Sequence, residues 1–328
     1  MGSAGTGEES PGNSRNIGMY GLQEIVEREY RACGFSAAGV AAFALLEEEK
    51  ERFVQWLGQG YGADMGYLER SAGYRHDLRR LFPAVRSVVV TLTSYRRPPE
   101  VRQPDGAPRI ARFAWGDDYH DVLKRNLRRL LETIRGYEGF GGAKGRPVTD
   151  SAPAFERAWA VRAGLGWIGR SSMLIHPRLG SFTLIGMLLL DMPLSDGCLP
   201  AQRVPDGCGN CRRCMEACPT KAIVAPRVVN AGRCLSYQTI ERPGAVESAV
   251  RPFLDGRIFG CDRCMEVCPY NNRPDMPLAP ENAGLEAVAE RLELTADGWR
   301  EMTGEEFEAR FARSPLLRAG LEKIKSSL

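Results

Sequence analysis

The most constraining feature of this sequence is a cysteine pattern that occurs almost twice. Eight of the ten cysteines lie between residues 208 and 268. The first copy, CGNCRRCMEACP, runs from Cys208 to Pro219, and the second, IFGCDRCMEVCP, runs from Ile258 to Pro269. When the copies are aligned on their Cys-Pro ends, Ile258 stands opposite Cys208, so the second copy is one cysteine short. Thiols at this density normally bind metal, and the chain must fold around it.

The spacing C-x2-C-x2-C-x3-C-P of the first copy is typical of a bacterial ferredoxin site. In such a site three closely spaced cysteines bind one [4Fe–4S] cluster, and the fourth, beside the proline, binds the neighbouring cluster. Structural zinc uses paired C-x2-C units, and it gives no reason for the third cysteine or for the proline. We therefore expect two [4Fe–4S] clusters, the first of them bound by Cys208, Cys211, Cys214 and Cys268.

The second cluster lacks one thiolate, because this exchange leaves it only Cys218, Cys261 and Cys264. Cys198 and Cys234 are both near enough in sequence, and spacing alone does not decide between them. Cys234 lies between the two copies, with enough chain on either side to fold back onto the cluster, so we favour it. Cys33 and Cys198 are then expected to be ordinary small residues.

Composition and charge limit the class of protein. A net charge of +3 over 328 residues does not describe a protein that binds nucleic acid by charge alone. No stretch reaches the roughly 18 apolar residues of a membrane span. Residues 1–16 lack the basic and apolar regions of a secretory signal and are expected to be a disordered tail. We expect a cytoplasmic monomer without membrane association, in a compartment that keeps thiols reduced.

The rest of the chain divides into three parts. In residues 17–194, apolar periodicity predicts helices over residues 22–33, 41–57, 117–137 and 154–163. Apolar and β-branched runs predict strands over residues 86–95, 172–176 and 181–191. This alternation indicates an α/β (α+β) domain. Residues 195–275 should form the ferredoxin-like module, and residues 276–328 short helices that pack against one of these two parts.

Asp150 is the most interesting carboxylate, because it follows the glycine-rich loop 139–147 and precedes the helix expected from residue 154. Asp150 or Ser151 can cap that helix, and a capping role would lower the pKa of Asp150. If Ser151 is the cap, Asp150 is free in a desolvated pocket and keeps a proton near neutral pH, as a proton donor requires. The residues alone leave both interpretations open.

Two further motifs resemble cofactor sites and are interpreted structurally. Gly164-Leu-Gly166-Trp-Ile-Gly169 matches G-x-G-x-x-G, but it follows a helix instead of a strand, so we expect a left-handed helix end and no NAD site. Asp118-Tyr119-His120 lacks the glycine of the D-x-H-x-x-G pattern of base-on corrinoid proteins, so His120 is expected to be packed or solvated. The basic face of the same helix is a solvated surface or, alternatively, faces tRNA.

Taken together, these residues resemble the epoxyqueuosine reductase family, the iron–sulfur and cobalamin enzymes that finish queuosine synthesis on tRNA. The resemblance covers about residues 61–271 and continues weakly into residues 307–321. Besides the cysteine constellation, it is carried by the motifs YRHDLRRLFPAVRSVVVT, ARFAWGDDYHDVLKRNL, TDSAPAFERAWAVRAGLGWIGRSSMLI, GSFTLIGMLLLDMPL, CLSYQTIE and GCDRCMEVCPYN.

The resemblance implies a function, the reduction of epoxyqueuosine to queuosine at the wobble position of tRNA. It implies base-off cobalamin between the α/β domain and the clusters, which would deliver electrons from an external flavodoxin or ferredoxin to the cobalt. The reduced cobalt would attack or reduce the epoxide-bearing ring. Asp150, in the D-S-A-P motif, would protonate the departing oxygen, and Cys234 would be the eighth cluster ligand.

The same resemblance implies individual contacts. The corrinoid contacts carried over are Arg75, Asp150, Ser171, Ser172, Ile185, Leu188, Ser236, Cys261 and Asp262. Contacts with the tRNA anticodon stem-loop are expected from the stretch TIERPG, residues 239–244, and from Tyr119, His120, Glu241 and Arg242, with a base flipped from the single-stranded loop. Two alternatives remain, a related corrinoid reductase that acts on a small molecule, as reductive dehalogenases do, and an electron carrier without corrinoid.

Overall fold

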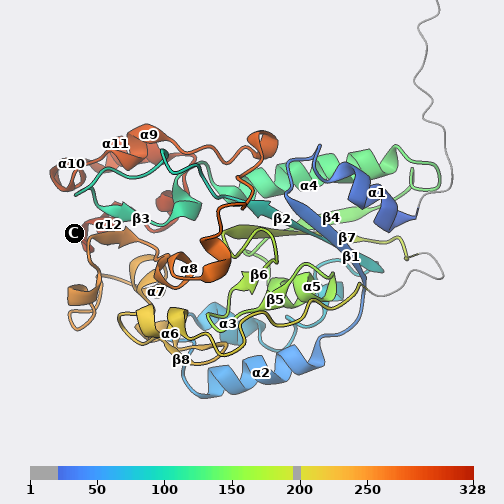
Figure 1. The fold of residues 1–328 in the computed structure, drawn as a ribbon, viewed down its shortest axis with the longest axis horizontal. Helices are drawn as coiled ribbons and strands as arrows, with labels where there is room; N and C mark the ends of the chain where they lie inside the picture. Colours follow the sequence, from blue (N-terminus) through green and yellow to red (C-terminus); the bar gives the residue numbers. More distant parts are fainter. Residues whose placement is uncertain (1–20, 195–200) are drawn as a thin grey trace, which may run out of the picture.

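A four-stranded sheet forms the centre of the N-terminal half of the chain. The structure is a computed structural model, and it describes residues 21–194 and 201–328. The strands lie in the order β1-β2-β7-β4, and every neighbouring pair is antiparallel (Figure 1). Their bounds are Ala37–Ala42 for β1, Ser87–Ser94 for β2, Gly145–Val148 for β4 and Thr183–Leu190 for β7. The domain is therefore of the α+β type, without a parallel α/β sheet.

Two of these strands match the sequence expectation and two do not. β2 and β7 fall within the expected strands 86–95 and 181–191. β1 overlaps the start of the helix expected from residue 41, and β4 lies in the stretch expected to be a glycine-rich loop. β1 has the sequence AAGVAA, with one β-branched residue, so its pairing with β2 defines it more than its own propensity does.

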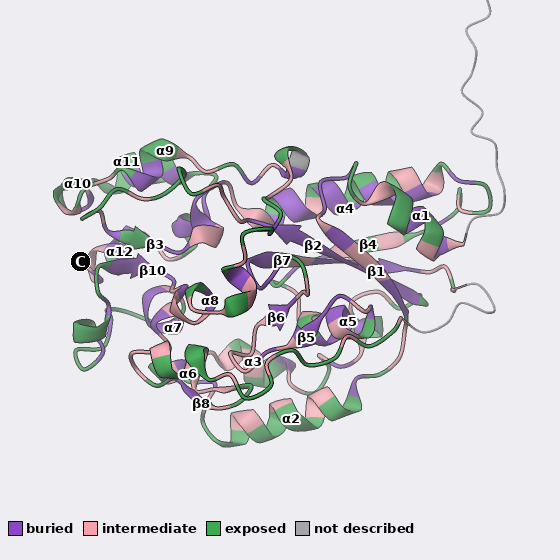
Figure 2. Cartoon of the chain, viewed as in Figure 1, coloured by how far each residue is buried: buried purple, intermediate pink, exposed green. Residues whose placement is uncertain are grey.

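Helices cover both faces of this sheet (Figures 1 and 2). On one face α1 (Leu22–Glu29) and α4 (Tyr119–Arg135) pack against β7, and Cys33 is buried among them as an ordinary small residue. On the other face α5 (Glu156–Arg162) buries Trp159, while α2 (Glu47–Gly58) and α3 (Gly66–Ser71) lie further out. The two cores hold the site-bearing ends of α4 and α5 in place.

The cysteine-rich part contains only short elements. The hairpin of β5 (Trp167–Ile168) and β6 (Leu174–Ile175) projects from the first domain toward this cysteine-rich part, and the chain then returns to the sheet in β7. Its own elements are α6 (Arg213–Ala217), β8 (Ile223–Ala225), β9 (Val228–Val229), α7 (Leu235–Ile240) and α8 (Arg263–Glu266). α6 lies against α8, so the two cysteine motifs are side by side although they are far apart in sequence.

The C-terminal segment packs across both preceding parts of the chain. It contains α9 (Ala289–Leu292), α10 (Ala296–Glu301), α11 (Gly304–Phe311) and α12 (Leu321–Lys325). These helices share one apolar core with β3 (Arg109–Ile110) and β10 (Arg257–Phe259), which pair in parallel. The expectation that the segment packs against only one part is therefore wrong, because β3 and β10 join the two parts beneath it.

Two expectations concern residues that the structure does not describe. The proposed tail, residues 1–16, and Cys198 lie outside the described residues. Within residues 21–194 and 201–328, no helix is both long enough and apolar enough to cross a membrane.

Gly39 of β1 marks the closest approach between the sheet and α5, and it supplies a test of the fold. A Cβ atom at Gly39 would lie 2.2 Å from the carbonyl oxygen of Ala163. We expect Gly39→Ala to lower the free energy of unfolding by about 2 kcal/mol or more, because backbone must shift to relieve the overlap. Gly58→Ala, at the end of α2 with open space around it, should be neutral or stabilise by about 0.5 kcal/mol. Urea unfolding of both variants measures the difference, and equal stabilities would contradict this packing.

Candidate active site

The first group of thiols combines the three early cysteines of one motif with the last cysteine of the other. Burial raises the pKa of Cys214, and Cys208, Cys211 and Cys268 raise it further because they lie close to it. Burial and the thiols of Cys208 and Cys211 raise the pKa of Cys268 in the same way. The indole of Trp167 donates to Sγ of Cys208 at 3.4 Å. The structure thus brings together the set expected for the first cluster.

The second group contains Cys218, Cys234, Cys261 and Cys264. Burial raises the pKa of Cys264 well above its ordinary value, and Cys234 and Cys261 add to this. Burial also raises the pKa of Cys261 to about 11, with a contribution from Cys234, and Cys218 raises the pKa of the buried Cys234. Such thiols are neutral at pH 7, so a bound metal must displace their protons. Cys234 lies where the shorter motif lacks a ligand.

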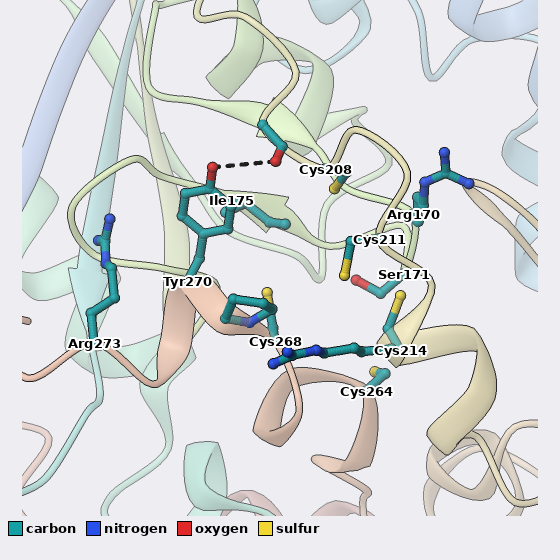
Figure 3. Close-up of a pocket in the computed structure, with 13 residues that line it drawn as sticks. Arg170, Ser171, Ile175, Cys208, Cys211, Cys214, Cys264, Cys268, Tyr270 and Arg273 are labelled. Carbon is teal, nitrogen blue, oxygen red and sulfur yellow. Dashed lines mark hydrogen bonds between the residues drawn. The ribbon is translucent and has the colours of Figure 1, made fainter.

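The four thiols of the first group line a cavity of about 450 Å³, which is the space that a cluster bound by them would fill. Figure 3 shows the side chains of Cys208, Cys211, Cys214 and Cys268 around it, with Cys264 of the second group close by. Among the described residues, no three metal-binding side chains gather closely enough to hold a single ion. A cubane of four irons carries its thiolates on the outside, so it requires a wider arrangement than one tetrahedral zinc ion does.

The N-terminus of α4 holds His120 between two carboxylates. Asp118 caps the helix by accepting from the backbone N–H of His120 at 3.0 Å, and its Oδ1 is 2.6 Å from Nδ1 of the same imidazole. Nε2 of His120 pairs with Oδ1 of Asp150. Tyr119 donates its hydroxyl to the other oxygen of Asp150, and its ring stacks on the imidazole with centroids 4.1 Å apart. Arg318 contacts Asp118 at 3.1 Å and fixes the far end of this chain of bonds.

The charges along this chain place the proton on His120. Burial alone would lower the pKa of His120, but its hydrogen bonds to Asp118 and Asp150 outweigh burial and raise the pKa to about 9. Partial burial would raise the pKa of Asp150, yet the hydrogen bond and charge of His120 lower it. This arrangement favours the ionised carboxylate of Asp150, whereas the proton-donor interpretation requires a carboxyl group that keeps its own proton. His120, which was expected to be packed or solvated, is packed, since its side chain is 6% exposed.

Asp150 is also not a helix cap. α5 begins at Glu156, and its N-cap residue is Phe155, which makes no side-chain capping bond. The Asp150 side chain, 48% exposed, lies on the connection between β4 and α5. The capping interpretation of Asp150 and Ser151 is therefore wrong, because the helix starts two residues later than expected and its N-cap position is residue 155.

The glycine motif after α5 is structural, as expected. Gly164 follows the helix with a φ of +74°, which is the left-handed conformation that glycine favours. Gly166 precedes β5, and Gly169 follows β5 in the turn of the β5–β6 hairpin, so the motif is followed by a strand and not by the helix that would receive a pyrophosphate. A Cβ at Gly166 would lie 2.2 Å from the carbonyl oxygen of Ile175, so close strand approach explains this glycine.

One expected corrinoid contact is excluded by its position in the sheet. Side chains of β7 alternate between the two faces, and Leu188 points into the core formed with α1 and α4, where it is 0% exposed. The expectation that Leu188 contacts the corrinoid is therefore wrong. Ile185 lies on the opposite face, is half-buried, and packs at the border of the core formed with α5. Ile185 is accessible from the side on which α5 lies.

The other expected contacts lie near the cluster module or the carboxylate–imidazole chain. Arg75 donates from Nε to Ser71 at 2.7 Å, and its half-buried guanidinium lies near the charge of Glu156. Ser171 and Ser172 are in the turn of the β5–β6 hairpin, and Ser171 lines the cavity in Figure 3. The last three are Ser236, half-buried on α7, and the adjacent residues Cys261 and Asp262.

Asp262 links the cluster module to the start of α4. Its Oδ2 accepts from the backbone N–H of Arg112 at 2.8 Å, whereas its Oδ1 is buried without a partner among the described residues. Burial raises the pKa of Asp262 to about 6. A buried acceptor without a donor is rare in proteins and indicates a water or ligand. Asp262 is therefore oriented to meet a bound group at this junction.

Sequence reasoning missed two acidic residues of the site. Asp118 was noted only as part of a triplet, although a D-x-H pattern at a helix start does signal a cap that can also bond the imidazole. Glu156 opens α5, and its Oε1 is buried without a partner in the described part of the chain. Burial, aided by the charge of Asp150, raises the pKa of Glu156 well above its ordinary value. Its sequence position resembles that of any glutamate in a first helical turn, so no signal set it apart.

The stretch expected to meet tRNA is held by the C-terminal helix. Lys323 donates to the carbonyl oxygens of Arg242 at 2.9 Å and Gly244 at 2.8 Å. Glu241 is exposed, and its pKa is raised by partial burial and by the charge of Asp150, which lies on the same side. His120 is buried, so its expected contact with the tRNA surface is wrong, and the hydroxyl of Tyr119 is already bonded to Asp150.

Two groups of four thiols beside a proton-bearing imidazole define an iron–sulfur oxidoreductase. Comparison with known proteins agrees. Residues 207–271 match the family described as "4Fe-4S double cluster binding domain", and residues 75–151 match "Epoxyqueuosine reductase QueG, DUF1730". The epoxyqueuosine reductase of Cyclobacterium marinum is 36% identical over 306 residues, which cover 93% of this chain and 95% of that protein. The chain belongs to the epoxyqueuosine reductase family.

Solved structures show the same relationship. The epoxyqueuosine reductase of Bacillus subtilis, with its catalytic loop swung out of the active site, is 26% identical with a TM-score of 0.80. An epoxyqueuosine reductase with an epoxyqueuosine-modified tRNA-Tyr stem loop is 27% identical with a TM-score of 0.77. Each match covers 92% of this chain and 78% of the other. The arrangement of both parts of the chain is therefore that of the family.

The shared proton of His120 can be tested by titration. We expect an NMR titration midpoint of about 9 for His120, compared with about 6.5 for a free histidine. Asp118→Asn removes one bonding carboxylate, so the midpoint should fall toward 6.5. Because the folded pKa lies above the unfolded one, this interaction stabilises the fold fully below about pH 6.5 and is lost as pH rises through about 9.

An internal control is available for that titration. Burial and the charges of Arg178 and Arg273 lower the pKa of His176 to about 4, and this residue should titrate identically in both proteins. An unchanged His120 midpoint in Asp118→Asn would contradict the bonded arrangement.

Proposed function

We propose that this chain reduces epoxyqueuosine to queuosine at the wobble position of tRNA, using two [4Fe–4S] clusters and base-off cobalamin. The observation that carries the proposal lies at the start of α4. Tyr119, which bonds Asp150, packs against the same apolar cluster as Cys264 of the second thiol group. This apolar cluster connects the carboxylate–imidazole group to a thiol of the second group.

The two clusters are assigned by the thiol groups. One would be bound by Cys208, Cys211, Cys214 and Cys268, and the other by Cys218, Cys234, Cys261 and Cys264. The mutual effects of these thiols on their pKa values support this division, and so does the match to a double-cluster family over residues 207–271.

Cobalamin would lie at the junction of the first domain and the cluster module, held by Arg75, Asp150, Ser171, Ser172, Ile185, Ser236, Cys261 and Asp262. Two buried oxygens without partners support a ligand there, Oδ1 of Asp262 and Oε1 of Glu156. The amide groups around a corrin ring are donors that such acceptors require. Both nitrogens of His120 are bonded to carboxylates, in keeping with a base-off cofactor that takes no ligand from this histidine. When bound, cobalamin supplies a reducing cobalt centre.

The residues of the chain supply the proton. Removal of an epoxide oxygen as water, which leaves an alkene, takes two electrons and two protons. His120 holds one proton at Nε2 and passes it to the substrate oxygen through Asp150, and the half-exposed carboxylate of Asp150 takes up the second proton from water. Tyr119 stays protonated, because burial and Asp150 raise its pKa, and it fixes the orientation of Asp150. Asp118 keeps the imidazole charged and aligned.

The tRNA would approach over the loop of residues 239–244, with Glu241 and Arg242 as contacts. Lys323 fixes the backbone of this loop, and the charge of Asp150 reaches Glu241. Single-stranded loops allow a base to be flipped out of its stack and into a pocket. As a tRNA-modifying enzyme, the chain would act in the cytoplasm as a monomer and receive electrons from an external flavodoxin or ferredoxin.

A single-turnover assay tests the reaction and its proton path. Cobalamin-loaded protein with a strong reductant should convert epoxyqueuosine-containing tRNA, followed by mass spectrometry of the nucleosides. Asp150→Asn should retain iron and cobalamin but lose about a hundredfold or more in rate, because it can no longer relay a proton. Asp121→Asn, an exposed position in the first turn of α4 next to His120, is the matched control and should be active.

Two results would count against this proposal. Full activity of Asp150→Asn would remove Asp150 from the proton path. No conversion by intact, cobalamin-loaded wild-type protein would exclude the proposed substrate and favour a related reductase of another substrate.

The eighth cluster ligand is tested by iron content. Cys234→Ala, reconstituted without oxygen, should hold about four irons per chain in place of about eight, because the second cluster loses a thiolate. Cys33→Ala, in the apolar core, is the control and should keep about eight. Full iron content in Cys234→Ala would assign the ligand elsewhere, and zinc in place of iron in the wild-type protein would contradict the cluster assignment altogether.

A further inference from the structure

The charged side chains that line the cavity of the first thiol group are all positive. Three arginines line it, Arg170, Arg213 and Arg273, and no aspartate or glutamate does. Figure 3 shows Arg170 and Arg273 on either side of the cysteines. The same cavity exposes the thiols of the first group, so a molecule bound at its mouth lies directly against that group. The three arginines and the thiols of the first group are thus accessible from the same surface.

These arginines have no carboxylate partner among the described residues. Arg170 donates to the carbonyl oxygen of Gly209 at 2.5 Å, and Arg273 donates to that of Pro177 at 2.6 Å. Arg213 is exposed at the start of α6, and no hydrogen bond or ion pair of its guanidinium is seen in the described chain. These contacts leave the three positive charges uncompensated by side chains.

Nearby acidic residues do not offset this charge. Asp206 is paired with Arg227 and accepts from the backbone N–H of Cys208 at 2.8 Å. Glu216 is exposed on α6 but does not line the cavity. The surface around the cavity is therefore positive on balance at the point where the thiols are accessible.

A second cavity provides a contrast. It has a volume of about 370 Å³ and lies next to Cys218 and Cys234 in sequence, but no cysteine lines it. Its cations, Lys221 and Arg233, are accompanied by the carboxylate of Glu247. Its positive charge is partly offset by a carboxylate, and it gives no direct access to a thiol. It is therefore a less suitable site for an electron donor than the first cavity.

The two thiol groups are ordered relative to the proton source. Cys264 of the second group packs in the same apolar cluster as Tyr119, which bonds Asp150. Cys264 also lines the cavity enclosed by the first group. An electron that enters the first group therefore finds the second group next to it, and the second group is the one connected to Tyr119.

We propose that the arginine-lined surface at the mouth of this cavity, outside the space that the first cluster itself would fill, is the docking site of an acidic one-electron carrier protein. Complementary charge raises the rate of encounter, here by attraction between carboxylates of the carrier and the three arginines. In each encounter the carrier is oxidised by one electron and the cluster held by the first group is reduced by one, so two encounters supply one substrate reduction. The need for two electrons rests on the proposed function, whereas the docking site does not depend on the substrate.

The test measures reduction of the clusters without tRNA. Reconstituted protein is mixed with reduced acidic flavodoxin in a stopped-flow instrument, and the loss of iron–sulfur absorbance gives a bimolecular rate constant. At low salt, Arg213→Glu should lower that constant about tenfold or more. The difference should vanish at about 1 M salt, where the Debye length is about 3 Å. Binding of oxidised flavodoxin, measured by calorimetry, should weaken in parallel.

Controls separate docking from other effects. Arg80→Glu makes the same charge change at an exposed site away from the cavity and should leave the rate constant unchanged. Reduced methyl viologen, a small cation, should reduce Arg213→Glu at least as fast as wild type. Arg213→Gln, which removes the charge without reversing it, should give a smaller decrease, and iron content shows that each variant is assembled.

Three outcomes would overturn the proposal. The first is an unchanged flavodoxin rate constant in Arg213→Glu, and the second is an equal decrease in Arg80→Glu. The third is slower reduction by methyl viologen together with a shifted cluster potential, because the arginines would then only balance the charge of the cluster. Failure of epoxyqueuosine conversion in the separate turnover assay would leave these measurements unaffected.

Discussion

The exchange of one cysteine between the two motifs is the constraint on which the rest of the structure depends. Cys268 completes the first thiol group and Cys218 joins the second, so α6 and α8 are held side by side. This places Asp262 against the backbone of Arg112, a few residues before α4 begins. The start of α4 carries Asp118 and His120, and so the position of the thiols fixes the position of the proton source.

The pairing of His120 with two carboxylates resolves a conflict in the requirements of an acid in this site. A buried carboxyl group that keeps its own proton needs an apolar pocket, whereas Asp150 is half-exposed and bonded. An imidazolium held by Asp118 and Asp150 retains its proton through neutral pH, and Asp150 remains an ionised acceptor next to it. In the proposed reaction the acid would therefore consist of two residues, with the buried His120 holding the proton and the half-exposed Asp150 passing it on.

Local patterns allowed the cluster module to be predicted, while long-range contacts limited the rest. Cysteine spacing is fixed by the cluster itself, so the first thiol set could be predicted from the residues, and the eighth thiolate from the resemblance. β1 was missed because AAGVAA has weak strand propensity and depends on β2 for pairing. Leu188 was misassigned because a sequence motif does not say which face of β7 a side chain takes. The proton on His120 depends on Asp150, thirty positions away, and no spacing rule links them.

The parallel pairing of β3 with β10 has a consequence for synthesis of the chain. On the ribosome, β3 and Trp115 emerge long before β10 and the terminal helices that cover them. Until then the edge of β3 and the apolar side chains around Trp115 are open to other chains. A chain released before β10 is therefore expected to aggregate more readily than the full-length chain.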